Sequence, residues 1–292
     1  MFSPQLSKKI ASVSLSESTI SNLVRLAIEE DLAGGIDITS QAIVSSDQVS
    51  KAEFCNRSAG IISGVLVAAA VLEYCGVTEY ELLISDGDFL PKNSKLISVK
   101  GNTRSILLAE RTALNFLGRL SGISTLTNTW VKEVSEYKVK IRDTRKTTPG
   151  YRELEKYAVR MGGGTNHRMS LSDAALIKDN HVLAAGGVVP AFNEVLAKYP
   201  TLPIEIEIDT ITQLKEIMNL KVDLAMLDNM SPEQCREAAQ LVAGKFKLEA
   251  SGGITLANAK AYGASGVDYL AIGALTHSAT NLDIGLDFLG EK

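Results

Sequence analysis

The stretch PIEIEIDTITQLKEIMNLKVDLAMLDNMSPEQCREAAQLVAGKFKLEAS, residues 203–251, indicates the fold class of this chain. It holds three short strand-like runs, PIEIEI, DLAML and FKLEA, and a helical pattern at 232–243 separates the last two. Strand-like runs that alternate with helices are typical of βα units and a parallel sheet. The same texture extends outward, with VKI before Asp143, ALI before Lys178 and DYLAI before Gly273. This many units favours a parallel α/β barrel.

Charged residues and glycines stand at or near the ends of these strand-like runs. In a parallel barrel all the strand carboxyl ends open on one face, which is where such folds place their sites. We therefore expect several separate strands to direct polar groups into one mouth. The set consists of residues 143–146, Lys178, Glu207, Asp228, residues 251–253 and Gly273.

Residues 140–178 concentrate positive charge, with nine Lys or Arg against four Asp or Glu, about +5 in a chain of formal net charge −4. Such a concentration inside an acidic chain indicates a local anion site. Arg offers a planar fork that suits carboxylate and phosphate, and Lys offers a point charge. The block predicts a small, highly anionic substrate. Its cationic set is Arg145, Lys146, Arg168 and Lys178, with His167, beside the glycine run 162–164.

Several other residues of the predicted barrel have both a functional and a structural interpretation. Glu207 and Asp228 suit sugar hydroxyls or a divalent cation, or else structural ion pairs with lysines. The glycine-containing ends at 251–253 and 272–274 suit a phosphate, or form tight turns only. We expect Asp209 to cap the helix that follows it. The spacing of Arg152, Lys156 and Arg160 predicts an exposed helix face, and we place His277 at a helix start or on the surface.

The first part of the chain, to about residue 110, reads as an α+β domain without evident chemistry. We predict helices at 19–31 and 67–75, strand and turn at 51–65, and a strand at 95–100. A strong helix follows at 107–121 and contains Arg111. Its Gly118 and Gly122 lie four residues apart, which would permit close helix packing.

Composition excludes several classes of protein. The three cysteines show no CxxC or metal-ligand spacing, and the first residues lack the apolar core of a signal peptide, so we expect a reduced, cytoplasmic protein. The longest apolar run, near 61–72, is too short to span a bilayer. The negative net charge argues against general nucleic-acid binding.

A series of motifs resembles the quinolinate phosphoribosyltransferase family over nearly the whole chain. The most specific are ERTALNFLGRLSGIST from Glu110, RDTRKTTPG from Arg142, KYAVRMGGGTNHR from Lys156 and LIKDNH from Leu176. IEIEIDT, LDNMSP, EASGGI and GVDYLAIGALTHS continue the resemblance in order. It implies an α/β protein with an N-terminal α/β sandwich domain at 1–112, joined by the tail 279–292, and an open, incomplete parallel α/β barrel at 113–278.

The resemblance also implies a reaction. Quinolinate and phosphoribosyl pyrophosphate would give nicotinate mononucleotide, pyrophosphate and CO2 on the route to NAD, with Mg2+, in a homodimer or larger homo-oligomer. Thr144, Arg145, His167, Arg168 and Lys178 would bind substrate, and Arg111 would enter from the neighbouring subunit. Lys146, Glu207 and Asp228 would be catalytic, with the two carboxylates at the ribose and the metal, directly or through water. Ser251, Gly252 and Gly253 with Ile272, Gly273 and Ala274 would cradle the 5′-phosphate.

Four alternatives to this function stay open from the sequence. One is a related protein of the molybdenum-transport type that acts on another substrate. Another is a phosphoribosyltransferase for a different heterocyclic acid. A third is a barrel lyase with a Schiff base on Lys146 or Lys178. The last is a non-catalytic phosphosugar-binding protein.

Overall fold

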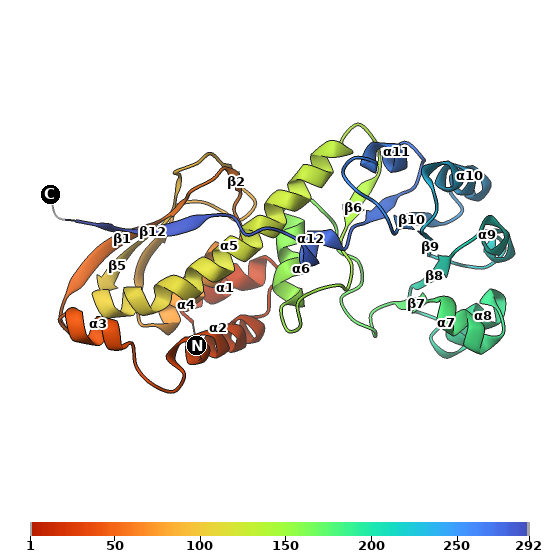
Figure 1. Ribbon diagram of the computed structural model, residues 1–292. Helices are drawn as coiled ribbons and strands as arrows, with labels where there is room; N and C mark the ends of the chain where they lie inside the picture. Colours follow the sequence, from red (N-terminus) through yellow and green to blue (C-terminus); the bar gives the residue numbers. More distant parts are fainter. Residues whose placement is uncertain (1, 291–292) are drawn as a thin grey trace. The chain divides into compact units, whose positions relative to one another are not determined.

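The computed structural model describes residues 2–290 and consists of two compact units (Figure 1). One unit takes in the chain up to Leu126, then Glu153–Gly163 and the segment from Ser278 onward. The other consists of Thr127–Arg152 and Gly164–His277. The long helix α5, Thr103–Glu133, contributes to both units, and the sequence-based division between 112 and 113 falls inside it.

The first unit is built on a four-stranded sheet in the order β12-β1-β5-β3, with every pair antiparallel. Its strands are β1 Val49–Asn56, β3 Glu79–Leu82, β5 Lys95–Asn102 and β12 Ile284–Leu289, while β2 Gly60–Ile61 pairs separately with β4 Phe89–Leu90. Helices α1 Pro4–Ser12, α2 Glu17–Leu32 and α4 Val65–Tyr74 contact one another, and α3 Ile38–Ile43 is short. Helix α4 is buried along 65–72 because that run is wholly apolar.

The second unit is a parallel sheet of six strands in the order β6-β11-β10-β9-β8-β7. The strands are β6 Lys140–Arg142, β7 Ala175–Ile177, β8 Ile204–Ile208, β9 Leu224–Asp228, β10 Lys247–Ser251 and β11 Tyr269–Ala271. The helices are α7 Asp179–Ala185, α8 Val188–Lys198, α9 Ile211–Ile217, α10 Pro232–Val242, α11 Ala259–Gly263 and α12 Ala274–His277. Because β6 and β7 are the two edges, the barrel is open, and the predicted fold class is confirmed.

Local signals explain where the barrel helices begin and end. Helix α10 begins after Ser231, whose side chain accepts from the backbone N–H of Gln234 in a capping box, with Pro232 at the first helical position. Its buried residues, Cys235, Ala238 and Val242, follow helical spacing. The connection from β9 to α10 is therefore short, and it holds Asp228, the last residue of β9, close to the start of that helix.

The predicted exposed face of the helix at 151–161 is wrong. In α6, Arg152–Met161, the consecutive residues 154–159 are all buried, and Lys156 is 0% exposed. Glu155 is equally buried and accepts a hydrogen bond from Arg119 Nη2 at 2.7 Å. The spacing of the charges predicts which residues share one face of the helix, but it does not predict that this face is buried.

Two smaller expectations are also corrected. Gly118 and Gly122 admit an extended segment instead of a helix, since a Cβ at residue 122 would lie 2.1 Å from the carbonyl oxygen of Thr280. The cap of α9 is Thr210, whose side chain accepts from the Gln213 N–H, and not Asp209.

Candidate active site

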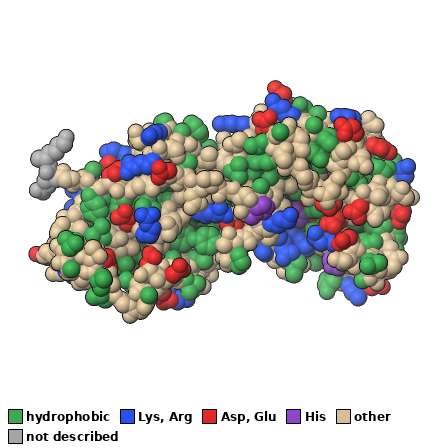
Figure 2. All heavy atoms as spheres, in the orientation of Figure 1, with side chains coloured by type: hydrophobic (Ala, Val, Ile, Leu, Met, Phe, Trp, Pro, Cys, Tyr) green, Lys and Arg blue, Asp and Glu red, His purple; other side chains and the backbone are tan. Residues whose placement is uncertain are grey.

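A cavity of about 710 Å3 opens at the carboxyl ends of the barrel strands. Figure 2 shows Lys and Arg side chains gathered beside histidines over this part of the chain. The cavity is lined by every predicted substrate-binding residue except Arg111: Thr144, Arg145, Lys146, His167, Arg168, Lys178, Glu207, Asp228, Ser251, Gly252, Gly253, Ile272, Gly273 and Ala274. Arg111 is an exposed residue of α5 in the first unit.

Sequence reasoning missed several lining residues: Leu176, Met226, Asn229, Ile254, Ala271 and His277. Leu176, Met226 and Ala271 lie within strands, where an apolar side chain gives no sign of facing a mouth or a core. His277, expected at a helix start or on the surface, lies at the end of α12 and lines the cavity. Asn229 had a usable signal, because it directly follows a strand that ends in Asp228.

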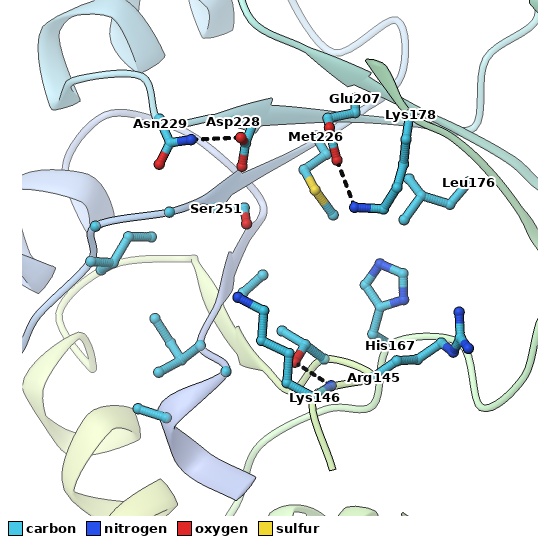
Figure 3. Close-up of a pocket in the computed structure, with 18 of the residues that line it drawn as sticks. Arg145, Lys146, His167, Leu176, Lys178, Glu207, Met226, Asp228, Asn229 and Ser251 are labelled. Atoms are coloured by element: carbon cyan, nitrogen blue, oxygen red, sulfur yellow. Dashed lines mark hydrogen bonds and ion pairs between the residues drawn. The ribbon is translucent and has the colours of Figure 1, made fainter. Parts of the chain in front are cut away.

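One side of the cavity carries its carboxylates (Figure 3). Glu207 ends near the Lys178 ammonium, with 3.0 Å between Oε2 and Nζ. Burial raises the pKa of Asp228, and the negative charges of Glu207 and Asp209 raise it further, against the opposing effect of Lys178 and Lys146. Two carboxylates that repel each other in a partly dry site attract a cation or a developing positive charge.

Asn229 shapes the backbone around Asp228. Its side chain donates from Nδ2 to Asp228 Oδ2 at 2.6 Å, and its N–H donates to the Ser251 carbonyl at 2.8 Å. It adopts a left-handed backbone with φ of 53°, which Asn tolerates better than most residues. Gly252 makes room for it, since a Cβ there would lie 2.1 Å from Asn229 Oδ1.

The opposite side carries guanidinium groups that have too few protein partners. Within the described residues, no hydrogen bond reaches the buried Nε atoms of Arg145 and Arg168. Arg168 does donate from Nη1 to the Ala174 carbonyl at 2.8 Å. Burial lowers the pKa of Arg168, and the charge of Arg145 lowers it further. Two neighbouring cations with unsatisfied donors form a site for an anion.

Lys146 projects into the same cavity from the loop after β6 (Figure 3). Its backbone is held at both ends: its N–H donates to Thr144 Oγ1 at 3.0 Å, and its carbonyl accepts from Thr276 Oγ1 at 2.7 Å. A Cβ at Gly273 would lie 3.1 Å from Lys146 Cδ and 3.2 Å from His277 Nε2. The absence of a side chain at residue 273 thus lets the lysine stem and the histidine approach the strand end.

Asp143 departs from the expected arrangement. It is 0% exposed and does not line the cavity. Its carboxylate accepts from the backbone N–H of His167 at 2.8 Å and from Asn166 Nδ2 at 2.5 Å. Asp143 therefore organises the loop that presents His167 and Arg168, and it does not face the mouth itself.

Glu207 and Asp228 are the cavity carboxylates that suit a magnesium ion. They are hard oxygen donors, and the pKa of Asp228 is raised by burial and then by the negative charges of Glu207 and Asp209, which a cation would offset. Among the described residues, the one group of three or more potential ligands is His167, Glu205 and Glu249, so the two carboxylates stand without a third protein ligand. That fits Mg2+, which is usually held by one or two carboxylates, waters and substrate phosphates.

Comparisons with known proteins give one consistent result. Profiles described as the quinolinate phosphoribosyl transferase N-terminal and C-terminal domains match residues 37–121 and 123–287. A nicotinate-nucleotide pyrophosphorylase [carboxylating] of Mycobacterium leprae is 49% identical, over 90% of this chain and 95% of its own. A probable enzyme of the same name from Bacillus subtilis is 42% identical, over 88% and 89%. The nicotinate-nucleotide pyrophosphorylase structure from Francisella tularensis superposes with a TM-score of 0.90 at 39% identity, covering 94% of this chain and 98% of that one.

Proposed function

This chain belongs to the quinolinate phosphoribosyltransferase family, and we propose that the barrel cavity is where quinolinate meets phosphoribosyl pyrophosphate. The chain is an enzyme that forms nicotinate mononucleotide for NAD synthesis. The identity to nicotinate-nucleotide pyrophosphorylases supports this reaction over the Schiff-base lyase, the non-catalytic binding protein and the two substrate variants.

The pair Arg145 and Arg168 carries the proposal. Quinolinate has two neighbouring carboxylates, and the two guanidinium groups have buried donors that the described residues leave unsatisfied. A dicarboxylate would satisfy both groups and would offset the burial and the repulsion from Arg145 that together lower the pKa of Arg168. We assign the acid pocket to this side of the cavity, with Thr144, His167 and Lys178 around it.

Glu207 and Asp228 would act on the ribose. As the bond from the anomeric carbon to pyrophosphate breaks, positive charge develops on the sugar, and fixed carboxylates stabilise it. The ring nitrogen of quinolinate then forms the new bond to that carbon. The resulting pyridinium accepts the electron pair left when the 2-carboxylate departs as CO2, and the ring carbon takes up a proton. No protein nucleophile is required.

Lys146 and the glycine loops would hold the phosphates. Lys146 directs a mobile positive charge at the pyrophosphate side. Gly252, Gly253 and Gly273 leave backbone amides uncovered at the ends of β10 and β11, where a 5′-phosphate can approach them. Mg2+ at Glu207 and Asp228, directly or through water, would neutralise charge on the departing pyrophosphate.

We further propose a cytoplasmic homodimer in which Arg111 of one subunit completes the cavity of the other. The exposed position of Arg111 on α5 supports its availability to a second chain. Within the described residues, no helix has the length and apolar character needed to cross a membrane.

Selectivity between acids tests the acid pocket. Equilibrium titration should show that quinolinate binds more tightly than nicotinate, which has one carboxylate, by about 10-fold or more, since a charged hydrogen bond contributes about 1.5–3 kcal/mol. In Arg145→Ala and Arg168→Ala that preference should shrink. Equal binding of both acids to the unaltered protein would remove the two arginines from the acid pocket.

A further inference from the structure

A buried cluster behind the cavity wall is not used by the reaction described above. It joins His167 to Glu205 of β8 and Glu249 of β10, and Arg142 of β6 closes it. His167 and Glu205 are each 6% exposed and Glu249 is 0% exposed. Of these residues, His167 alone lines the cavity. The cluster thus reaches the substrate pocket only through the imidazole.

The carboxylates have too few partners for two full negative charges. Arg142 Nη1 lies 2.8 Å from Glu249 Oε2, and the same guanidinium lies over the Tyr269 ring at 4.6 Å from its centroid. Glu205 Oε1 and Glu249 Oε1 have no hydrogen-bond partner among the described residues. Burial, followed by the charge of Glu205, raises the pKa of Glu249 to about 7.

The contacts of His167 decide where its own proton lies. Its Nδ1 accepts a hydrogen bond from the backbone N–H of Arg168 at 2.7 Å, so Nδ1 carries no proton. Its Nε2 lies 2.9 Å from Glu205 Oε2 and 3.6 Å from Glu249 Oε1, which are ion-pair distances without hydrogen-bond geometry. An unprotonated Nε2 would set its lone pair against a carboxylate oxygen. The contacts therefore favour a neutral ring with the proton on Nε2.

We propose that Glu205 and Glu249 are positioning residues that hold His167 as the neutral Nε2–H tautomer, with both ring nitrogens turned to the protein. The imidazole then offers quinolinate a flat, uncharged carbon surface. The positive charge of the acid pocket comes from Arg145, Arg168 and the lysines. The inference rests on the proposed function only for the identity of the ligand, because the tautomer is a property of the free protein.

Nitrogen-15 NMR of the imidazole groups in the ligand-free, full-length protein tests the tautomer directly. The chain has three histidines, and the His167 signals are assigned by their loss in His167→Asn. We expect an unprotonated Nδ1 and a protonated Nε2. A protonated Nδ1, either as the other tautomer or as imidazolium, would overturn the proposal.

Glu205→Gln and Glu249→Gln test the positioning role. Each should change the His167 nitrogen signals and lower kcat/KM for quinolinate by about 10- to 100-fold, as outer partners that orient a functional histidine do. Glu155→Gln is the matched control, since Glu155 is also 0% exposed and paired with an arginine, Arg119, at 2.7 Å. Its His167 signals should be unchanged. Unaltered signals in both cluster variants would refute the role.

Isosteric variants give a second readout. His167→Gln keeps a donor where Nε2 stands, and His167→Asn keeps a group where Nδ1 stands, so Gln should retain more quinolinate turnover than Asn. The reverse order would contradict the proposed tautomer. The two hypotheses fail separately: a protein that does not convert quinolinate fails the proposed function, whereas one that does so with a protonated Nδ1 fails this inference alone.

Discussion

Asn229 occupies the space that a side chain at Gly252 would need, with its Oδ1 only 2.1 Å from a Cβ built at that glycine. The same Asn229 side chain donates to Asp228. The end of β10 therefore helps to set the position of a carboxylate at the end of β9.

Gly252→Ala should displace Asn229 and lower kcat by about 10-fold or more, since small displacements of reacting groups are costly. Gly244→Ala is the matched control, because Gly244 does not line the cavity. Both glycines have positive φ, 86° and 78°, so both variants carry a similar backbone penalty of roughly 1–2 kcal/mol. A Cβ at residue 244 would meet nothing within 4 Å. Equal kinetic losses in the two variants would show that the Asn229 contact has no role in turnover.

Arg145→Ala and Arg168→Ala should each weaken quinolinate binding by about 10- to 150-fold, the equivalent of about 1.5–3 kcal/mol for a charged hydrogen bond. Titration of ligand-free variants measures this. Arg25→Ala serves as the control, because Arg25 forms an exposed pair with Glu29 on α2. Retained affinity in both pocket variants would place the acid elsewhere.

Asp228→Asn should lower kcat far more than it lowers quinolinate affinity, because the charge acts mainly as the sugar cation develops. The variant should also unfold at the same or a higher temperature at neutral pH, since it removes a charge that burial and Glu207 disfavour. Asp209→Asn, at an exposed residue, is the comparison. A small, equal loss in kcat and affinity would make Asp228 a structural carboxylate.

Glu249 gives a pH-dependent prediction for stability. Burial, and then the charge of Glu205, raise its pKa from 4.5 to about 7 against the opposing effect of His167 and Arg142. A raised folded-state pKa means that the stability associated with the bound proton is full below about 4.5 and is lost as pH rises through about 7. Urea unfolding should therefore show Glu249→Gln gaining relative to the unaltered protein across that window. A difference between the two proteins that stays constant across that window would contradict the raised pKa of Glu249.

Mixed dimers test the sharing of Arg111. Arg111→Ala and Asp228→Asn chains should each be nearly inactive alone. Their mixed dimers should recover one intact site of two, since a two-fold interface exchanges the same residue in both directions. Co-purified mixed dimers that are no more active than their parents would contradict the shared site.

The strand ends were predictable because the residue after a buried strand must emerge at one face of a parallel sheet. Nearness to a strand end located Asp228, the last residue of β9, and Glu207, the fourth of the five residues of β8. It did not separate Glu207, which lines the cavity, from Glu205, which lies two residues earlier on the same face of β8. Glu205 is only 6% exposed, and its carboxylate lies beside His167. Depth along a barrel is set by strand stagger, which no local pattern records.

Other parts of the site depend on tertiary packing. The buried position of Lys156 in α6 could not follow from its charge spacing, and the place of His277 on the cavity depends on the missing side chain at Gly273. Arg111 entered the prediction only through the family resemblance. A residue on a helix outside the barrel has no strand end to mark it.

The central claim is tested most directly by the stoichiometry of turnover. The purified chain is incubated with quinolinate, phosphoribosyl pyrophosphate and Mg2+, and nicotinate mononucleotide, pyrophosphate and CO2 are measured together. We expect the three products in equal amounts, with none formed when either substrate is omitted. A folded protein that binds both substrates and forms no nicotinate mononucleotide would contradict the account.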